Sequence, residues 1–294
     1  MAKILLFQII DSEVANIRPK FKSTFLIQRM NGTTYDLGKM GIRVRSFDPP
    51  SPSYQHTFQQ VGKYNAVLTD TKVGQLVIPF VFDMYANDNY DYELQRMQVS
   101  KVFESSEPFY IINLRIPFLR WRVVADAFSI QRLDNYWKAS SISVNLNCID
   151  GYAQTIATTL DDIKNDGNKW GLGIGFPKDK PVKYKFTNET TFEVFNASII
   201  PLLADDKPVK IKFNGTVNSD LKIENQTTGQ TFEFKKPLSK SETLIIDGLM
   251  PTVDNKNRYA DSNHAYLDFA TQFNQIKVTG ASDFTISFET RFYY

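Results

Sequence analysis

The chain has 294 residues, of which 42% are hydrophobic and 14% aromatic, and its formal net charge is +2. This composition is typical of a folded globular protein, and the near-zero net charge argues against a strongly basic surface for nucleic acid or for an anionic membrane. Cys148 is the only cysteine, which excludes an intramolecular disulfide and a zinc site built on thiolates.

The first predicted elements are short strands over residues 4–10, 23–29 and 42–45, with a turn at Asn31-Gly32. We interpret residues 4–10 as a strand rather than a signal peptide, because the apolar run is short and acidic residues follow it without a small-residue cleavage site. No run in the sequence approaches the length of a membrane span.

Residues 48–64 do not suit a central strand. Pro49, Pro50 and Pro52 favour an extended segment, because proline lacks a backbone N–H and fixes its own φ. Two interpretations are open, a surface loop or an arm that embraces a neighbouring subunit. In the second interpretation the candidate subunit interface is made of the residues that alternate with Gln and Lys, namely Tyr54, His56, Phe58 and Tyr64.

Between residues 73 and 113 the sequence predicts a strand, a helix and another strand. This helix stands out because almost all other predicted elements are strands. Residues 76–82 are apolar on both faces, which predicts a central strand covered on both sides. The helix is predicted near residues 90–104, and Asp88 or Asn89 can cap its start. Its predicted buried face carries Tyr90, Leu94, Met97 and Val102.

Further strands are predicted over residues 109–114, 121–124, 128–133 and 141–148, which complete a first domain at residues 1–152. The last of these strands alternates cleanly and places Cys148 on its inward face, so we expect a core residue rather than a nucleophile. Residues 153–180 lose the pattern and are predicted to be a linker, with a short helix near residues 155–163.

Residues 181–294 are predicted to form a second domain. Its strands recur about every 10–12 residues with turn signals between them, a pattern typical of an antiparallel β-sandwich. They include a hairpin with a glycine turn at Gly229, and a strand over residues 273–278 that leads through Gly280 into another from Phe284 onward. The sequence therefore predicts an all-β protein with one packed helix and two domains.

Catalytic chemistry is sparse. The only histidines, His56 and His264, fall in different predicted domains, so the sequence offers little support for a His-based catalytic triad. His264 with Asp261 and Asp268 could bind a metal, but an ordinary loop histidine is the favoured interpretation. We predict no catalytic, cofactor or metal site, and we expect the protein not to be an enzyme.

A carbohydrate-binding β-sandwich without catalytic activity is the alternative function. Exposed aromatic rings can stack on a sugar, and the candidate glycan contacts are Trp170, Tyr259 and Tyr266. The competing interpretation of these three residues is that they are core or interface aromatics.

Several ordered patterns carry a family resemblance. In the N-terminal half they are residues 46–54 (SFDPPSPSY), 74–82, 91–97 (DYELQRM) and 108–112 (PFYII). In the C-terminal half they are residues 195–197 (FNA) followed by Pro201, and residues 223–229 (IENQTTG), 243–247 (TLIID) and 273–276 (FNQI). On these patterns the chain resembles the distal tail protein (Dit) family of siphophages that infect Gram-positive bacteria.

The resemblance implies an N-terminal β-sandwich with a helix that forms a hexameric ring, and a C-terminal galectin-like sandwich. It also implies a structural role in the virion tail, after assembly in the bacterial host cytoplasm. The ring would join the major tail protein of the tail tube to a tail-associated lysin-like protein and to receptor-binding proteins. DNA would pass through it without sequence-specific binding, and neither a cofactor nor a membrane is implied.

Overall fold

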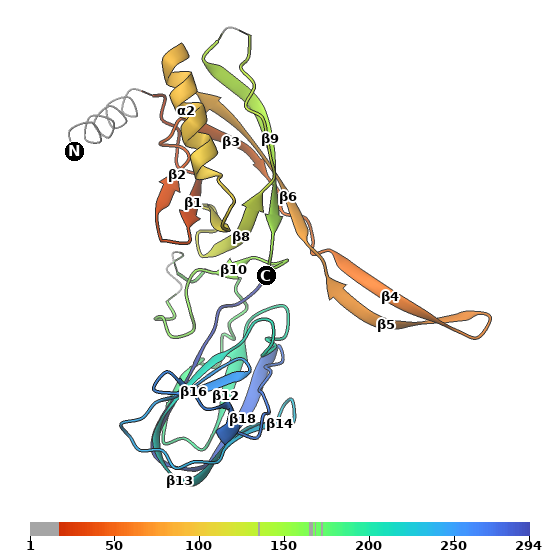
Figure 1. Cartoon of the computed structure of the whole chain (residues 1–294), viewed down its shortest axis with the longest axis vertical. Helices are drawn as coiled ribbons and strands as arrows, with labels where there is room; N and C mark the ends of the chain where they lie inside the picture. The colour runs from red at the N-terminus through yellow and green to blue at the C-terminus, as the bar shows by residue number, and fades with distance from the viewer. Residues whose placement is uncertain (1–17, 135, 165–166, 168, 172) are drawn as a thin grey trace. The chain divides into compact units, whose positions relative to one another are not determined.

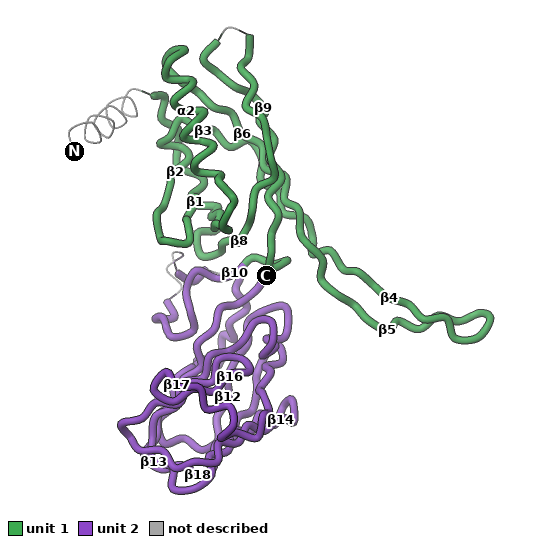
Figure 2. The backbone as a smooth tube through the Cα atoms, in the orientation of Figure 1, with its two compact units in different colours: residues 1–153 green, residues 154–294 purple. Residues whose placement is uncertain are grey.

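The computed structural model describes residues 18–134, 136–164, 167, 169–171 and 173–294 (Figure 1). The strand predicted over residues 4–10 lies outside these described residues. The chain divides into two compact units, unit 1 at residues 1–153 and unit 2 at residues 154–294 (Figure 2). The described residues are mostly β with a single α-helix, so the predicted fold class is confirmed. No described helix is long and apolar enough to cross a membrane.

The main sheet of unit 1 is antiparallel and follows the order β2-β1-β7-β8-β9-β6-β3. Its strands are β1 (Phe25–Arg29), β2 (Thr34–Asp36), β3 (Ile42–Phe47), β6 (Leu76–Tyr85), β7 (Phe109–Asn113), β8 (Leu119–Ala125) and β9 (Lys138–Cys148). The predicted turn at Asn31-Gly32 joins β1 to β2, and Gly32 has the positive φ of 88° that such a turn favours. Cys148 is buried, as its place in the alternating strand predicts.

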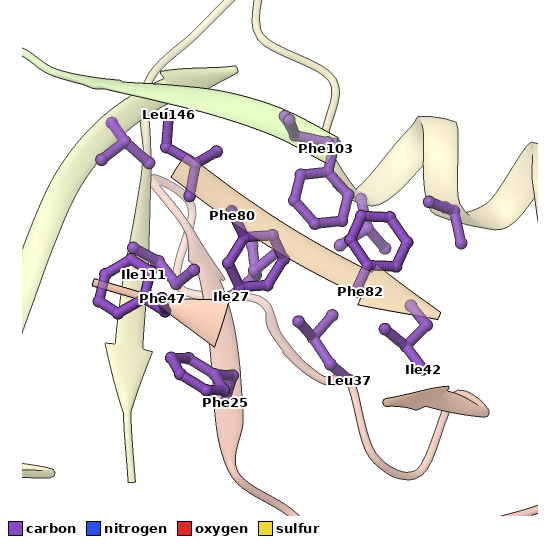
Figure 3. Close-up of a cluster of buried hydrophobic side chains, with 14 of the residues drawn as sticks. Phe25, Ile27, Leu37, Ile42, Phe47, Phe80, Phe82, Phe103, Ile111 and Leu146 are labelled. Atoms are coloured by element: carbon purple, nitrogen blue, oxygen red, sulfur yellow. The ribbon is translucent and has the colours of Figure 1, made fainter. Parts of the chain in front are cut away.

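An aromatic cluster fills the core of unit 1 (Figure 3). Phe80 lies at its centre, with its ring centroid 5.8 Å from that of Phe25 and 6.1 Å from that of Phe47. Phe82 stacks on Phe103 at 5.5 Å. These five side chains come from three strands, β1, β3 and β6, and from the C-cap of the helix, so the cluster fixes how those elements pack.

The prediction that β6 is buried on both faces is wrong for its first half. Ile78 and Phe80 point into the core, but Val77 is 42% exposed and Pro79 is exposed. The register of β3 begins opposite Phe80, so residues 76–79 pair with β9 alone. A proline is tolerated there because one edge of β6 has no partner strand at residues 76–79.

Helix α2 (Asn89–Val102) begins as predicted, because the Asp91 N–H donates to the Asp88 side chain over 2.7 Å. Its buried face differs from the predicted one. Tyr90 and Met97 are 70% and 66% exposed, whereas the buried residues are Asp91, Tyr92, Gln95, Val99 and Val102.

Partners from distant segments explain why polar residues of α2 are buried. The Arg18 guanidinium lies 2.7 Å from the Asp91 carboxylate, and both side chains are almost fully buried. Gln95 Nε2 donates to the Met40 carbonyl oxygen over 2.6 Å. A buried polar group is stable when it is paired, and the hydrophobic pattern of a helix carries no information on such pairing.

Unit 2 is an antiparallel β structure in the order β11-β18-β13-β15-β16-β17, with β12 on β18 and β14 on β13. Its elements are β10 (Gln154–Thr155), β11 (Lys185–Thr187), β12 (Thr191–Asn196), β13 (Lys210–Asn225), β14 (Gln230–Phe234), β15 (Leu244–Asp247), β16 (Met250–Val253), β17 (Lys256–Asn257), the 3-10 turn η1 (Tyr259–Asp261) and β18 (Gln272–Glu289). The predicted hairpin around Gly229 joins β13 to β14.

Strand β18 passes through a glycine that no other residue can replace without rearrangement. Gly280 has a φ of 83°, and a Cβ atom built on it would overlap the Asp220 carbonyl oxygen. The register of β18 with β13 is irregular between Val217 and Lys222, beside this point. The strand predicted over residues 273–278 and the one predicted from Phe284 onward are therefore parts of one bent strand, which ends at Glu289.

Two predicted elements are wrong. Residues 128–133 form no strand, because Phe128 packs on the Phe82 and Phe103 rings and Arg132 pairs with Glu93 of α2. Residues 155–163 form no helix. There the Thr159 hydroxyl donates to the Phe288 carbonyl over 2.6 Å, and such side-chain bonds to backbone compete with helical bonds.

Candidate assembly interface

The segment predicted to be an arm or a loop is a β-hairpin. Strands β4 (Tyr54–Val61) and β5 (Asn65–Val73) form a two-stranded sheet of their own, which projects from the body of unit 1 (Figures 1 and 2). Gly62 has a φ of 69° in the turn between them. The alternation of aromatic and polar residues suits a strand, and the prolines before Tyr54 keep the preceding segment out of the main sheet.

Contacts at both ends of the hairpin fix its base on unit 1. The Gly74 N–H donates to the Ser53 carbonyl over 2.7 Å, so the two ends of the hairpin lie side by side. The hydroxyls of Tyr54 and Tyr152 are 3.3 Å apart. Gly151 has a φ of 70°, and a Cβ atom there would lie only 2.7 Å from Val73 Cγ1. The hairpin therefore leaves unit 1 from a defined point.

The two faces of the hairpin differ in chemistry. The rings of Tyr54, His56 and Phe58 follow one another at centroid distances of 6.4 and 6.2 Å, which places them on one face. The register sets Val73 opposite Tyr54 and Leu68 opposite Phe58. We call this set the aromatic face: Tyr54, His56, Phe58, Leu68 and Val73.

The opposite face is more polar, since successive side chains of a strand alternate between faces. It carries Gln55 and Gln59, and Lys72 lies 3.4 Å from Asp70. We call this the polar face: Gln55, Thr57, Gln59, Asp70 and Lys72, with Val67 opposite Gln59 as an exposed apolar residue on the same face. A bulge between Thr57 and Phe58 absorbs the extra residue of β5, so the aromatic face stays continuous across it.

Every residue of the hairpin is exposed in the single chain. Phe58 is 62% exposed, and Tyr64 in the turn is 88% exposed. Three of the four predicted interface residues, Tyr54, His56 and Phe58, share the aromatic face, whereas Tyr64 lies at the tip. A contiguous exposed apolar surface of this kind marks an interaction site more often than it is left in water.

Sequence reasoning missed the contribution of β5. Leu68 and Val73 extend the aromatic face from the second strand, and both are exposed. A weaker signal was present, because residues 65–73 carry four β-branched residues at every second position, which favour a strand: Val67, Thr69, Thr71 and Val73. Pairing of the two runs across the Gly62 turn would have predicted a hairpin.

The candidate glycan contacts are not brought together as a ring platform. Trp170 is fully buried, with its indole 5.3 Å from the Phe176 ring and 6.0 Å from the Phe292 ring, so it cannot stack on a sugar. It belongs to the core of unit 2, although it falls in the segment predicted as a linker. Tyr259 and Tyr266 are exposed, and Tyr259 packs on His264 at 4.4 Å.

Two titratable side chains in the interior of unit 1, Cys148 and Asp83, have structural surroundings. Burial raises the pKa of the Cys148 thiol to about 11, so it stays protonated and is a poor nucleophile at neutral pH. The buried Asp83 carboxylate accepts hydrogen bonds from Arg45 Nε and from the Ser141 N–H. The hydrogen bond between Arg45 and Asp83 raises the pKa of Arg45. Among the described residues no group of three side chains could hold a metal ion.

A family model matches most of unit 1, and a solved structure matches most of the chain. Residues 30–148, within unit 1, match the model of the family described as phage tail protein RIFT-related domain. That match begins just after β1 and spans β2 to β9, together with the hairpin and α2. No curated protein sequence matches the chain.

Among solved structures, the chain is similar to the Dit (gp 19.1) protein of phage SPP1, described as a paradigm of the hub adsorption apparatus in phages that infect Gram-positive bacteria. That likeness has a TM-score of 0.66 at 10% identity and covers 91% of this chain and 99% of that one. A chain of the phage p2 baseplate in its activated conformation is similar with a TM-score of 0.46 at 10% identity, over 90% of this chain and 97% of that one. The chain therefore has the fold of a distal tail protein, as the sequence resemblance predicted.

Proposed function

We propose that this protein is a structural hub at the distal end of a phage tail, where six copies form a ring that joins the tail tube to the tail-tip proteins. The observation that carries the proposal is the match of residues 30–148 to the model of a phage tail protein family, within a chain that has the fold of a hub protein. DNA would pass through the ring without sequence readout, which suits a net charge of +2. We expect no catalytic step in this role.

The partners follow from the same proposal. The tail tube would meet one side of the ring, and a tail-associated lysin-like protein and receptor-binding proteins would meet the other parts. The protein would reside in the virion tail after assembly in the host cytoplasm.

The hairpin supports a ring because a two-stranded sheet has too little cover to be stable alone in water. Its aromatic face gains cover when it packs on another molecule. In a closed ring one patch of each subunit meets a different patch of the next. We therefore place the aromatic face in the contact between neighbouring copies, with Tyr54, His56 and Phe58 as its central residues.

The first test is the mass of the protein in solution, by light scattering on a sizing column, with negative-stain images of the same peak. Rings of about six copies are the expected result, because a cyclic heterologous interface closes at a fixed number of subunits. Monomers with measurable affinity for glycans would favour the carbohydrate-binding alternative instead.

Two neighbouring substitutions sharpen that test. Phe58→Glu places a charge on the aromatic face and should dissociate the ring, whereas Gln59→Glu places the same charge on the polar face and should leave it intact. Equal behaviour of the two variants would contradict the assignment of faces.

A deletion can remove the whole interface without opening the main sheet. Since the Ser53 carbonyl and the Gly74 N–H are 2.7 Å apart, a short Gly-Ser linker can replace residues 54–73. We expect a folded monomer with an unchanged circular dichroism spectrum apart from the lost strands. Rings that persist after this deletion would show that the hairpin is dispensable.

A further inference from the structure

Unit 2 contains a groove of about 780 Å³ between the polar face of its sheet and residues 159–163. A volume of this size is typical of a small-ligand site. The wall is formed by residues 159–163, Val182 and Tyr184. The floor is formed by side chains of β11, β13 and β18 and of the residue before β15, namely Lys185, Lys212, Asn214, Thr243, Thr285 and Ser287.

The register of the floor places a serine between two lysines. Ser287 of β18 lies opposite Lys185 of β11 on one side and opposite Lys212 of β13 on the other. Directly opposite side chains in an antiparallel pair have Cβ atoms about 5 Å apart. The three side chains therefore form a row across the floor, Lys–Ser–Lys, from segments that are far apart in the sequence.

The charge of this row is not neutralised by the protein. In the part of the chain that the structure describes, neither Lys185 nor Lys212 forms an ion pair. Their neighbours do, since Lys183 lies 3.9 Å from Glu189 and Lys210 lies 3.6 Å from Asp247. An anion between the two free ammonium groups would be held by charge-assisted hydrogen bonds.

The carboxylates on the wall do not cancel this charge, because each already has a cation. Asp161 lies 2.5 Å from Lys169, and this hydrogen bond lowers the pKa of Asp161. Asp162 lies 3.2 Å from Lys164. The charge left for a ligand is therefore that of the two lysines on the floor.

Uncharged polar groups lie beside the lysines. Thr285 is opposite Asn214 in the next row of the sheet. Asn214 Nδ2 donates to the Lys240 and Glu242 carbonyl oxygens over 2.9 and 2.8 Å, which leaves its Oδ1 as an acceptor. The Thr243 hydroxyl also lines the groove. These groups suit the hydroxyls of a polyol or sugar.

We propose that this groove binds a phosphate ester of a sugar or polyol, with the phosphate between Lys185 and Lys212 on Ser287 and the ligand hydroxyls on Asn214, Thr243 and Thr285. The site uses neither the hairpin nor the aromatic residues Trp170, Tyr259 and Tyr266. It stands apart from the ring proposal, since the groove lies within unit 2.

Calorimetry on the full chain tests the site with three probes: glucose 1-phosphate, inorganic phosphate and glucose. We expect glucose 1-phosphate to bind about tenfold more tightly than inorganic phosphate, and glucose alone not to bind measurably. Binding should weaken as salt is added, because the lysines are exposed. Equal affinity for inorganic phosphate and glucose 1-phosphate would overturn the assignment of a hydroxylated ligand.

The variants are Lys185→Gln with Lys212→Gln, and Lys277→Gln as the matched control. Lys277 is an exposed lysine of β18 that does not line the groove. The double variant should weaken glucose 1-phosphate binding about tenfold or more, and the control should change it less than about twofold. The site is wrong if glucose 1-phosphate does not bind, or if Lys277→Gln weakens binding as much as the double variant does. Unchanged thermal unfolding would show that all the variants are folded.

Discussion

The hairpin of unit 1 and the sheet from which it projects use similar residues in opposite environments. Phe58 of β4 and Phe80 of β6 both sit in strands, where successive side chains alternate between the two faces. Phe80 is fully buried among other aromatic rings, whereas Phe58 is mostly exposed. The comparison teaches that alternation specifies a strand, while the cover on each face decides whether an aromatic side chain is core or interface.

The largest expected difference is between the two phenylalanines. Phe80→Ala should lower the free energy of unfolding by about 3–5 kcal/mol, because it leaves a cavity among Phe25, Phe47 and Phe82. Phe58→Ala should change the stability of the monomer by less than about 0.5 kcal/mol. Urea denaturation of the monomeric fraction measures both. A large loss in Phe58→Ala monomers would mean that the hairpin is packed within its own chain.

The two regions also differ in their ion pairs. Asp91→Asn should destabilise the protein by about 3 kcal/mol, because it removes the charge of the buried carboxylate that pairs with Arg18. Asp70→Asn breaks the exposed pair with Lys72 and should cost less than about 1 kcal/mol. Thermal unfolding at low and high salt separates them, since only the exposed pair is screened. A salt-sensitive loss in Asp91→Asn would contradict its burial.

Glycines with similar backbone angles give a third contrast. Gly41 has a φ of 79°, and a Cβ atom there would lie 2.8 Å from the Tyr85 carbonyl oxygen. Gly62 has a φ of 69°, with no atom within 4 Å of a Cβ. Gly41→Ala should therefore cost about 2–3 kcal/mol and Gly62→Ala about 1 kcal/mol, as measured by urea denaturation. Equal costs would mean that the main chain near Gly41 relaxes freely.

The smallest effect concerns thiol titration. Burial, followed by the charge of Asp150, raises the pKa of Cys148 from 9.0 to about 11, so the thiol should resist alkylation at pH 8 while Gln59→Cys in the hairpin reacts readily. The unfolded chain releases this proton at a lower pH than the folded chain does. The contribution of Cys148 to stability is therefore complete below pH 9 and falls by up to about 2 kcal/mol as the pH rises toward 11.

A Cys148→Ala variant provides the control for that last measurement. Its free energy of unfolding should lack the component that declines between pH 9 and 11, while the decline from other groups remains. The same decline with and without Cys148 would show that other groups cause it.

The candidate interface was partly predictable. Tyr54, His56 and Phe58 share a face because residues two apart in a strand always do, and the sequence shows that spacing directly. The contribution of Leu68 and Val73 depends on a register with a bulge, which pairing across the turn decides. Trp170 illustrates the limit, because nothing in its Gly-rich neighbourhood indicates that Phe292, at the far end of the chain, buries it.

The sequence by itself determined the features that depend on neighbours along the chain: most strands, the cap of α2, the turns at Asn31-Gly32 and Gly229, and the inward place of Cys148. These follow from local backbone preferences and side-chain periodicity. Only the tertiary structure decided which faces are covered. The buried face of α2 is set by Arg18 and Met40, and the Lys185–Ser287–Lys212 row exists only where three strands meet. Burial and charge pairing are properties of contacts between distant segments, and a linear pattern does not contain them.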